Sequence, residues 1–272
     1  MSSLRGIWSA VPTPVDADYA PDAARAVIFY GELLEHGCDG INVLGTTGQA
    51  MSFDVSARRR LMEAVAESEI DGARVMCGTG AAALADAVTL TRTAHDAGFA
   101  AALVMPPFFY RDADDDGIMR VFDALLSATS GPVLLYNFPR MSGITFHLDL
   151  VTRLLDAFPR RIIGIKDSSN DRDYQREVIA RHPTLAILPG SENYLLQALE
   201  YGAAGCISGS VALWPALAQR VFRERSIEVA GQLAEQRDAL SGAPLIPTVH
   251  ARIAQARNDE AWRRVVPPLM SA

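Results

Sequence analysis

Lys166 is the only lysine among the 25 lysine and arginine residues of this chain. It stands at the end of an apolar run, 162–165, and a polar segment, 167–170, follows it. Arginine keeps its charge in proteins, whereas a lysine on an apolar strand can lose its proton and attack a carbonyl carbon as a neutral amine. The sequence therefore predicts a Schiff-base nucleophile at position 166, with a leftover surface lysine as the alternative.

Polar segments follow four other apolar runs: GTTGQ (45–49), YN (136–137), GSE (190–192) and SGS (208–210). Taken singly, each has an ordinary explanation. A tyrosine at a strand end more often packs than catalyses, Thr46 and Thr47 could cap the next helix, and Asn137 could satisfy turn backbone. These residues can carry chemistry only if the fold brings the strand ends together.

Short apolar runs alternate with amphipathic segments along most of the chain. The runs predict eight strands, at 6–14, 39–44, 73–78, 101–105, 132–137, 162–166, 185–189 and 204–209. The amphipathic segments predict eight helices, at 22–36, 54–69, 82–97, 115–129, 147–158, 171–181, 192–201 and 212–225. Most of the strands are apolar throughout, as in parallel strands that are covered on both faces.

Eight strand–helix units in this length predict an α/β fold, a (β/α)8 TIM barrel with a C-terminal helical extension, and a doubly wound sheet is the alternative. Residues 1–226 would form the barrel, and residues 227–272 a helical appendage. In such a barrel the active site lies where the strands end and the following loops begin. Lys166 and the four polar segments would then meet at one mouth.

The composition excludes several classes of protein. The net charge of −7 and the isoelectric point of about 5.3 argue against a nucleic-acid partner, whose phosphate backbone is negatively charged. No apolar run approaches the roughly 20 residues of a membrane span, and the N-terminus lacks the apolar segment of a signal peptide. Three widely spaced cysteines indicate buried free thiols, so we expect a cytoplasmic protein.

The five histidines are scattered without ligand spacing, so we expect no metal and disfavour a metal-dependent aldolase. The run Arg58-Arg59-Arg60 lies in a helical pattern and is interpreted as a solvated face. The segment GTGAAA (78–83) faintly resembles a dinucleotide fingerprint, but its third glycine is missing, and small residues at a tight turn explain it.

Several motifs resemble one known family nearly from end to end. SAVPTP (9–14) resembles its opening strand, GTTGQ (45–49) its GTTGE loop, YNFP (136–139) its YNxP motif, and GIKDS (164–168) its lysine strand. Because these motifs occur in order and at predicted strand ends, the chain resembles the N-acetylneuraminate lyase and dihydrodipicolinate synthase family of class I aldolases. The resemblance implies a TIM barrel whose lysine forms a covalent imine with the substrate and which needs no cofactor.

The resemblance also implies roles for the residues at the mouth. Lys166 would be the nucleophile, Tyr136 would move protons, and Thr46 would relay them. The remaining residues are expected to bind substrate: Thr47, whose side chain and backbone N–H would hold the keto acid's carboxylate, Gly48, Ile207 through its backbone, Ser208 and Ser191. Gly45 and Gly48 would let the backbone approach the ligand closely.

The chain departs from the family pattern at three positions. Gln49 replaces the glutamate of the loop. Met141 stands where dihydrodipicolinate synthases carry an arginine that grips the second substrate's carboxylate. Phe109 stands where the family usually places a tyrosine that reaches a neighbouring subunit's site, so Tyr110 is a candidate relay through a one-residue shift.

We therefore expect a pyruvate-dependent aldolase that reversibly cleaves a 2-keto-3-deoxy sugar acid to pyruvate and an aldehyde. The alternatives are 4-hydroxy-tetrahydrodipicolinate synthase, against which Met141 argues, and a dehydratase of similar acids. A non-catalytic binding barrel is disfavoured because the lysine, tyrosine and threonine set is intact. The relatives imply a homotetramer or a homodimer.

Overall fold

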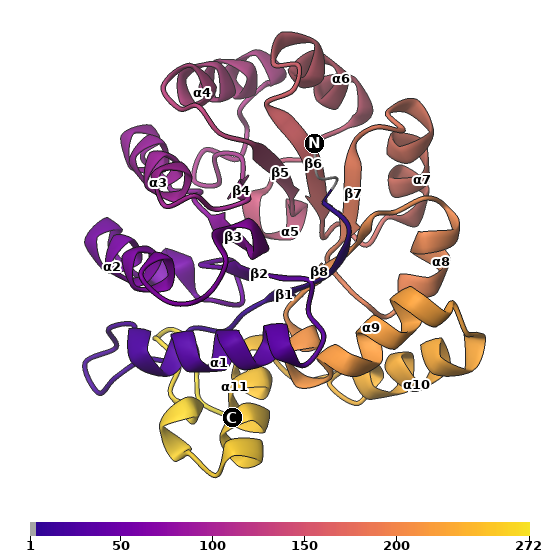
Figure 1. Ribbon diagram of the computed structural model, residues 1–272. Helices are drawn as coiled ribbons and strands as arrows, with labels where there is room; N and C mark the ends of the chain where they lie inside the picture. Colours follow the sequence, from indigo (N-terminus) through magenta and orange to yellow (C-terminus); the bar gives the residue numbers. More distant parts are fainter. Residues whose placement is uncertain (1–3) are drawn as a thin grey trace.

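Eight short parallel strands form the wall of a barrel, as the computed structural model of residues 4–272 shows (Figure 1). The strands are β1 (Gly6–Ala10), β2 (Gly40–Val43), β3 (Val75–Gly78), β4 (Ala101–Val104), β5 (Val133–Asn137), β6 (Ile162–Asp167), β7 (Ala186–Pro189) and β8 (Gly205–Ser208). All eight predicted strands are present. β1 ends at Ala10 rather than at 14, because Pro12 and Pro14 cannot donate backbone hydrogen bonds.

The strand order identifies the barrel. The strands pair in the order β7-β6-β5-β4-β3-β2-β1-β8, and every pair is parallel. The backbone N–H of Ala204 donates to the carbonyl of Ile187 at 2.8 Å, which joins the last two strands and closes the ring. The predicted TIM barrel is confirmed, and the doubly wound sheet is wrong.

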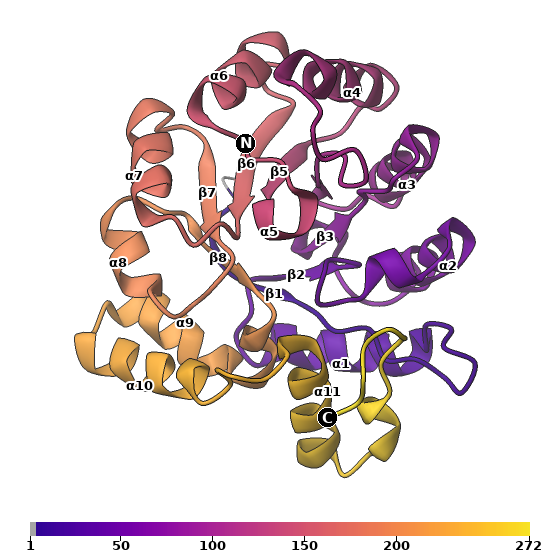
Figure 2. The ribbon, with the colours of Figure 1, turned by 180° about the vertical axis from the view of Figure 1, so that it is seen from behind.

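Helices surround this wall. They are α1 (Ala23–Glu35), α2 (Val55–Ala66), α3 (Leu84–Asp96), α4 (Asp115–Ser127), α6 (Leu148–Ala157), α7 (Arg172–Arg181), α8 (Leu195–Glu200) and α9 (Pro215–Glu224). A one-turn helix that was not predicted, α5 (Pro139–Ser142), follows β5. Seen from behind, α5 lies in front of the strands, at the end of the barrel where they finish (Figure 2).

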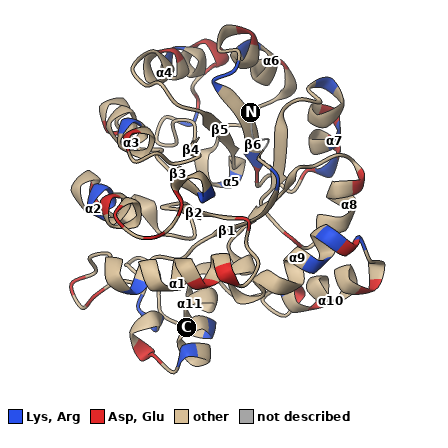
Figure 3. Ribbon diagram, viewed as in Figure 1, with Lys and Arg blue, Asp and Glu red and all other residues tan. Residues whose placement is uncertain are grey.

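The first helix shows how the sequence specifies these elements. The Asp22 side chain accepts a hydrogen bond from the backbone N–H of Arg25 at 3.0 Å and so caps the start of α1. The buried residues of α1 recur at helical spacing: Ala26, Phe29, Tyr30 and Leu33. This spacing puts one apolar stripe against the strands and leaves the other face to solvent. Figure 3 shows the result, with charged residues mainly on the helices and loops around the barrel.

The barrel interior is filled by side chains. The side chains that pack together there include Trp8, Met76, Leu103, Leu134, Tyr136, Leu188 and Ile207. The Trp8 indole occupies the room that Gly40, which has no side chain, leaves on the neighbouring strand. The barrel interior is therefore a packed core rather than a channel.

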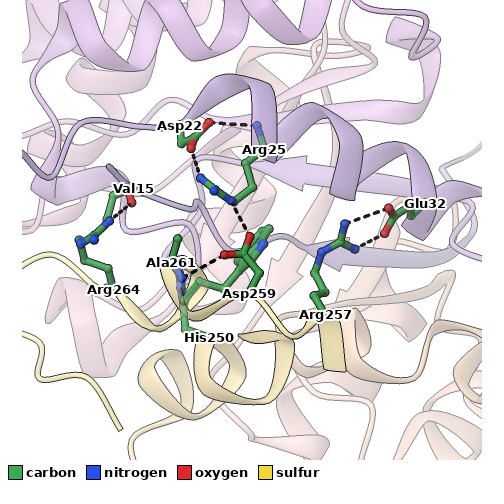
Figure 4. Close-up of polar contacts among 10 residues, drawn as sticks. Val15, Asp22, Arg25, Glu32, His250, Arg257, Asp259, Ala261 and Arg264 are labelled. Atoms are coloured by element: carbon green, nitrogen blue, oxygen red, sulfur yellow. Dashed lines mark hydrogen bonds and ion pairs between the residues drawn. The ribbon is translucent and has the colours of Figure 1, made fainter. Parts of the chain in front are cut away.

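Two further helices follow the barrel, α10 (Ile227–Asp238) and α11 (Leu245–Arg257). The segment around α11 lies against α1 (Figure 2). Arg257 pairs with Glu32, the Nε atom of Arg25 lies 2.9 Å from Asp259, and Arg264 donates to the carbonyl of Val15 at 2.9 Å (Figure 4). Helices are thus present where the appendage was expected, and the boundary at 226 stays a prediction. None of the helices described for residues 4–272 is long and apolar enough to cross a membrane.

Candidate active site

Tyr136 and Lys166 are opposite one another on adjacent strands. β5 pairs with β6 so that Tyr136 lies beside Lys166 and Asn137 beside Asp167. Because side chains alternate along a strand, the first pair points into the barrel when the second points outward. Tyr136 belongs to the cluster that fills the barrel, in agreement with this alternation.

Lys166 is buried beside Tyr136. Its side chain is buried, with a relative exposure of 3%, and Nζ lies 4.5 Å from the centre of the Tyr136 ring. Among residues 4–272 it has no carboxylate partner within ion-pair distance. The amine that imine formation requires is thus inside the barrel, next to the phenol of Tyr136.

The hydroxyl of Tyr136 is connected to the loop that follows β2. Thr46 Oγ1 and Tyr136 Oη lie 3.2 Å apart, and either oxygen can donate the hydrogen bond. The lysine, the phenol and the threonine hydroxyl therefore lie together although they are distant in sequence. A pair of hydroxyls in contact can pass a proton, which is the chemistry predicted for them.

The loop after β2 also contacts the loop after β8. Thr47 is buried, and its side chain packs so closely on Gly209 that a Cβ at 209 would lie 2.5 Å from Thr47 Oγ1. Ile207, at the end of β8, is in the barrel cluster with Tyr136. Thr47 and Ile207 are thus at the same end of the barrel as Lys166, and their contacts with substrate stay predictions.

Gly48 is confined by the chain itself. A Cβ at this position would lie 3.0 Å from the Val11 carbonyl oxygen and 3.1 Å from Thr13 Oγ1. Gly45 is confined similarly, because a Cβ there would lie 2.6 Å from Asn42 Nδ2. These glycines therefore let the loop pack on β2 and on the segment that follows β1, and a close approach to a ligand stays a prediction.

Three predicted residues have other surroundings. The hydroxyls of Ser208 and Ser210 lie 3.3 Å apart in a buried pair. The Ser191 hydroxyl accepts a hydrogen bond from the backbone N–H of Asn193 at 3.3 Å. Tyr110 is 71% exposed and stacks edge-on against Phe109. None of the hydrogen bonds described for residues 4–272 joins these side chains to Lys166 or Tyr136.

A hydrogen-bonded layer outside the barrel fixes the ends of β5 and β6. The buried carboxylate of Asp167 accepts hydrogen bonds from Asn137 and Gln175, both at 2.6 Å, and from Ser169 at 2.9 Å. Burial raises the pKa of Asp167, and these three donors oppose that effect. Asn137 also accepts from the backbone N–H of Phe146 at 3.0 Å, so its role here is structural.

The interpretation of the run Arg58-Arg59-Arg60 as a solvated face is wrong for Arg58. Its side chain is buried, and it donates to the carbonyls of Gly78 at 2.9 Å and Gly80 at 3.0 Å, directly after β3. The sequence carried a signal for this, because Arg58 lies on the same helical stripe as the buried Leu61 and Met62. Arg59 remains half exposed, as expected.

Glu192, the last residue of the predicted GSE segment, is a buried carboxylate that was given no role of its own from the sequence. One oxygen accepts from the indole N–H of Trp214 at 3.0 Å, and Oε2 is buried without a hydrogen-bond partner among the described residues. Glu192 follows β7 directly after the predicted GS pair, so its place at the mouth was readable from sequence. Its burial was not, because the partner lies 22 residues further along the chain.

A surface cavity lies at the opposite end of the barrel. It has a volume of about 560 Å³ and is lined by His36, Asp39, Arg74, Gln219 and Arg223, among others. Asp39 and Arg74 directly precede β2 and β3, so this cavity is at the strand starts, remote from Lys166. Residues 4–272 contain no cluster of three or more side chains suited to hold a metal ion.

Comparisons with known proteins agree with this geometry. The sequence model of the dihydrodipicolinate synthetase family matches residues 3–253. The chain is 36% identical over 225 residues to an uncharacterized DapA-like lyase of Chloroflexus aurantiacus, covering 82% of this chain and 75% of that protein. It is 33% identical over 204 residues to a 4-hydroxy-tetrahydrodipicolinate synthase of Synechococcus sp. (strain CC9605), covering 74% and 67%.

Solved structures give the same result. Dihydrodipicolinate synthase from Agrobacterium tumefaciens superposes with a TM-score of 0.92 at 26% identity, over 98% of this chain and 93% of the other. A 2-keto-3-deoxygluconate aldolase variant of Sulfolobus solfataricus, at 19% identity and a TM-score of 0.88 over 98% and 90%, shares the fold. The resemblance inferred from the motifs is thereby confirmed: the chain belongs to the dihydrodipicolinate synthetase family, a family of Schiff-base lyases of the class I aldolase type.

Proposed function

We propose that this chain is an aldolase that reversibly cleaves a 2-keto-3-deoxy sugar acid to pyruvate and an aldehyde. The observation that carries the proposal is the pairing of Lys166 with Tyr136 inside the barrel, with the Thr46 hydroxyl 3.2 Å from the phenol. Imine formation requires an amine as the nucleophile, and proton transfer requires an acid–base group such as the neighbouring phenol.

The proposed reaction proceeds through imine formation, cleavage of a carbon–carbon bond and release of pyruvate. The neutral Lys166 amine adds to the keto carbon, and the hydroxyl of the carbinolamine leaves as water with a proton from Tyr136, which gives a protonated imine and a phenolate. Tyr136 removes the proton of the substrate's C4 hydroxyl, the C3–C4 bond breaks, and its electron pair moves into the imine to give an enamine and a free aldehyde. Protonation of the enamine at C3 and addition of water then release pyruvate and restore the amine.

Two side chains support a polyhydroxylated acid as the substrate. Met141 cannot donate hydrogen bonds to a second carboxylate, whereas a guanidinium can donate two. The buried Oε2 of Glu192 has no donor among the described residues, and a substrate hydroxyl is a donor that would satisfy it.

The synthase is the second candidate. Relatives named 4-hydroxy-tetrahydrodipicolinate synthase are 33% identical to this chain, and a guanidinium does reach the turn after β5. The side chain of Arg111 lies against Gly143, so that a Cβ at 143 would lie 3.0 Å from its Cγ. Arg111 could grip the carboxylate of aspartate semialdehyde in place of the arginine that Met141 replaces.

A homo-oligomer of two or four subunits also belongs to this proposal. Phe109 and Tyr110 are 75% and 71% exposed, which is high for neighbouring aromatic residues of a soluble monomer. Sedimentation at micromolar concentration tests it, and a monomer would contradict it.

Substrate assays separate the candidates. We expect five- and six-carbon 2-keto-3-deoxy acids to release pyruvate, which lactate dehydrogenase and NADH report. A dehydratase would consume the acid without releasing pyruvate. The proposal fails if condensation of pyruvate with aspartate semialdehyde exceeds about 10⁴ M⁻¹s⁻¹ in kcat/KM, the low end of ordinary enzymes, while the sugar acids are inert.

A further inference from the structure

The loop that carries Thr46 ends in a constrained turn. The backbone N–H of Gln49 donates to the Thr46 carbonyl at 3.0 Å, and the next N–H, of Ala50, donates to Gly45 at 3.3 Å. Gln49 has a φ of 55°, in the left-handed region that costs a residue with a side chain about 1 kcal/mol or more. Something must hold Gln49 in this conformation.

The Gln49 side chain is buried and bonded to the C-terminal part of the chain. Its Oε1 accepts from the backbone N–H of Val266 at 2.7 Å, and its Nε2 lies 3.3 Å from Nε2 of His250. Nδ1 of His250 lies 2.9 Å from the carbonyl of Trp262. Since a carbonyl only accepts, Nδ1 carries the hydrogen and Nε2 offers its lone pair to the Gln49 amide.

This arrangement selects glutamine over glutamate. The amide donates to His250 and accepts from Val266 at the same time, whereas a carboxylate cannot donate. Burial lowers the pKa of His250 to about 4, so the ring is a neutral acceptor at ordinary pH. A glutamate here would turn a negative oxygen towards the imidazole lone pair.

The far side of this connection is fixed to the barrel. α11 and the segment after it are held on α1 by the ion pairs of Arg257 with Glu32 and of Arg25 with Asp259 (Figure 4). His250 and Val266 therefore offer the Gln49 amide a fixed anchor. Through the turn of residues 46–49 that anchor reaches Thr46, whose hydroxyl lies 3.2 Å from Tyr136.

We infer that Gln49 is a positioning residue: its amide ties the Thr46 loop to His250 and Val266 and thereby holds the Thr46 hydroxyl against Tyr136. This inference rests on the proposed function, because it assigns Gln49 an effect on proton transfer. The aldehyde half of the substrate is not needed to test it. Pyruvate alone suffices, because imine and enamine formation exchange its methyl protons with deuterium from D₂O.

The experiment is a double-mutant cycle read by the methyl signal of pyruvate in proton NMR. Thr46→Val removes the relay hydroxyl, and Gln49→Glu keeps the acceptor for Val266 but removes the donor to His250. We expect Gln49→Glu to slow exchange by about tenfold or more, because small displacements of catalytic groups reduce rates strongly. In the Thr46→Val background, Gln49→Glu should slow exchange by less than about twofold, since coupled residues are not additive.

Arg264→Met is the matched control, because it removes a hydrogen bond between the same C-terminal segment and Val15 without touching Gln49. It should lower the melting temperature and leave exchange within about twofold of wild type. The inference would be wrong, with the proposed function untouched, if the fold reductions in exchange rate of the two single variants multiplied in the double variant. A Gln49→Glu protein that is destabilised but exchanges at the wild-type rate would have the same consequence. A Thr46→Val protein that exchanges at the wild-type rate would overturn it together with the proposed relay.

Discussion

Tyr136 and Lys166 are paired residues of adjacent parallel strands, and Lys166 Nζ lies 4.5 Å from the centre of the Tyr136 ring. The pairing is fixed by the register of β5 and β6, in which the next pair, Asn137 and Asp167, is hydrogen-bonded at 2.6 Å on the outer side. A slip by one residue would exchange the two faces of the strand and turn Lys166 out of the barrel. The buried amide–carboxylate bond thus helps to keep the amine and the phenol together.

Tyr136→Phe should reduce turnover about 10²–10⁴-fold, because it removes a general acid–base group and keeps the ring. Pyruvate should still bind. Tyr30→Phe is the control, since it also removes a buried hydroxyl, which donates to the Pro12 carbonyl at 3.1 Å, but lies in α1. Steady-state rates and melting curves of both variants check this. Equal rates for the two variants would assign the proton transfer to another group.

Arg58→Met should lower the free energy of unfolding by about 2–4 kcal/mol, because the carbonyls of Gly78 and Gly80 lose buried donors. Arg59→Met removes an exposed arginine from the next position of the same helix and should change stability by less than about 0.5 kcal/mol. Urea unfolding of both variants provides the measurement. If both lose the same stability, the hydrogen bonds of Arg58 are not what stabilises the end of β3.

His250 should make stability depend on pH. Burial lowers its pKa from 6.5 to about 4. Between these two pH values the imidazole is protonated in the unfolded chain and neutral in the folded chain. The stabilisation is therefore complete above about pH 6.5 and is lost as the pH falls towards 4, with about 3 kcal/mol as the upper bound.

Urea unfolding between pH 4.5 and 8 measures this effect. His250→Asn should reduce the loss of stability across that range, whereas His36→Asn, which changes an exposed histidine, should keep the wild-type slope. Identical slopes for wild type and His250→Asn would contradict a neutral buried imidazole.

The repeating pattern of the sequence was sufficient to predict the barrel. Strands buried on both faces are continuously apolar, and eight such runs alternate with amphipathic segments, so their number and order could be read locally. The ends of the elements were less predictable. For example, α8 begins at Leu195 rather than at 192, and Glu192 and Asn193 belong to the preceding loop. The short helix α5 had a signal, with Pro139 at its first position and Gly143 after its end.

The site was predictable to the extent that strand ends determine it. Lys166, Tyr136 and Thr46 could be brought together from the barrel alone, because all parallel strands end at one mouth. The bond between Gln49 and His250 could not, since it joins residues 201 positions apart whose pairing depends on how the last helix packs. For the same reason Gln49 was visible in the sequence only as a departure from the family motif.

Borohydride trapping of the imine between Lys166 and pyruvate tests the central claim most directly. Because Lys166 is the only lysine, the reduced adduct can form there or on the N-terminal amine, and peptide masses distinguish the two. We predict an adduct on the peptide that contains Lys166, and none there in Lys166→Arg, which keeps the charge. An adduct confined to the N-terminal amine, or no adduct in a folded protein, would contradict the account.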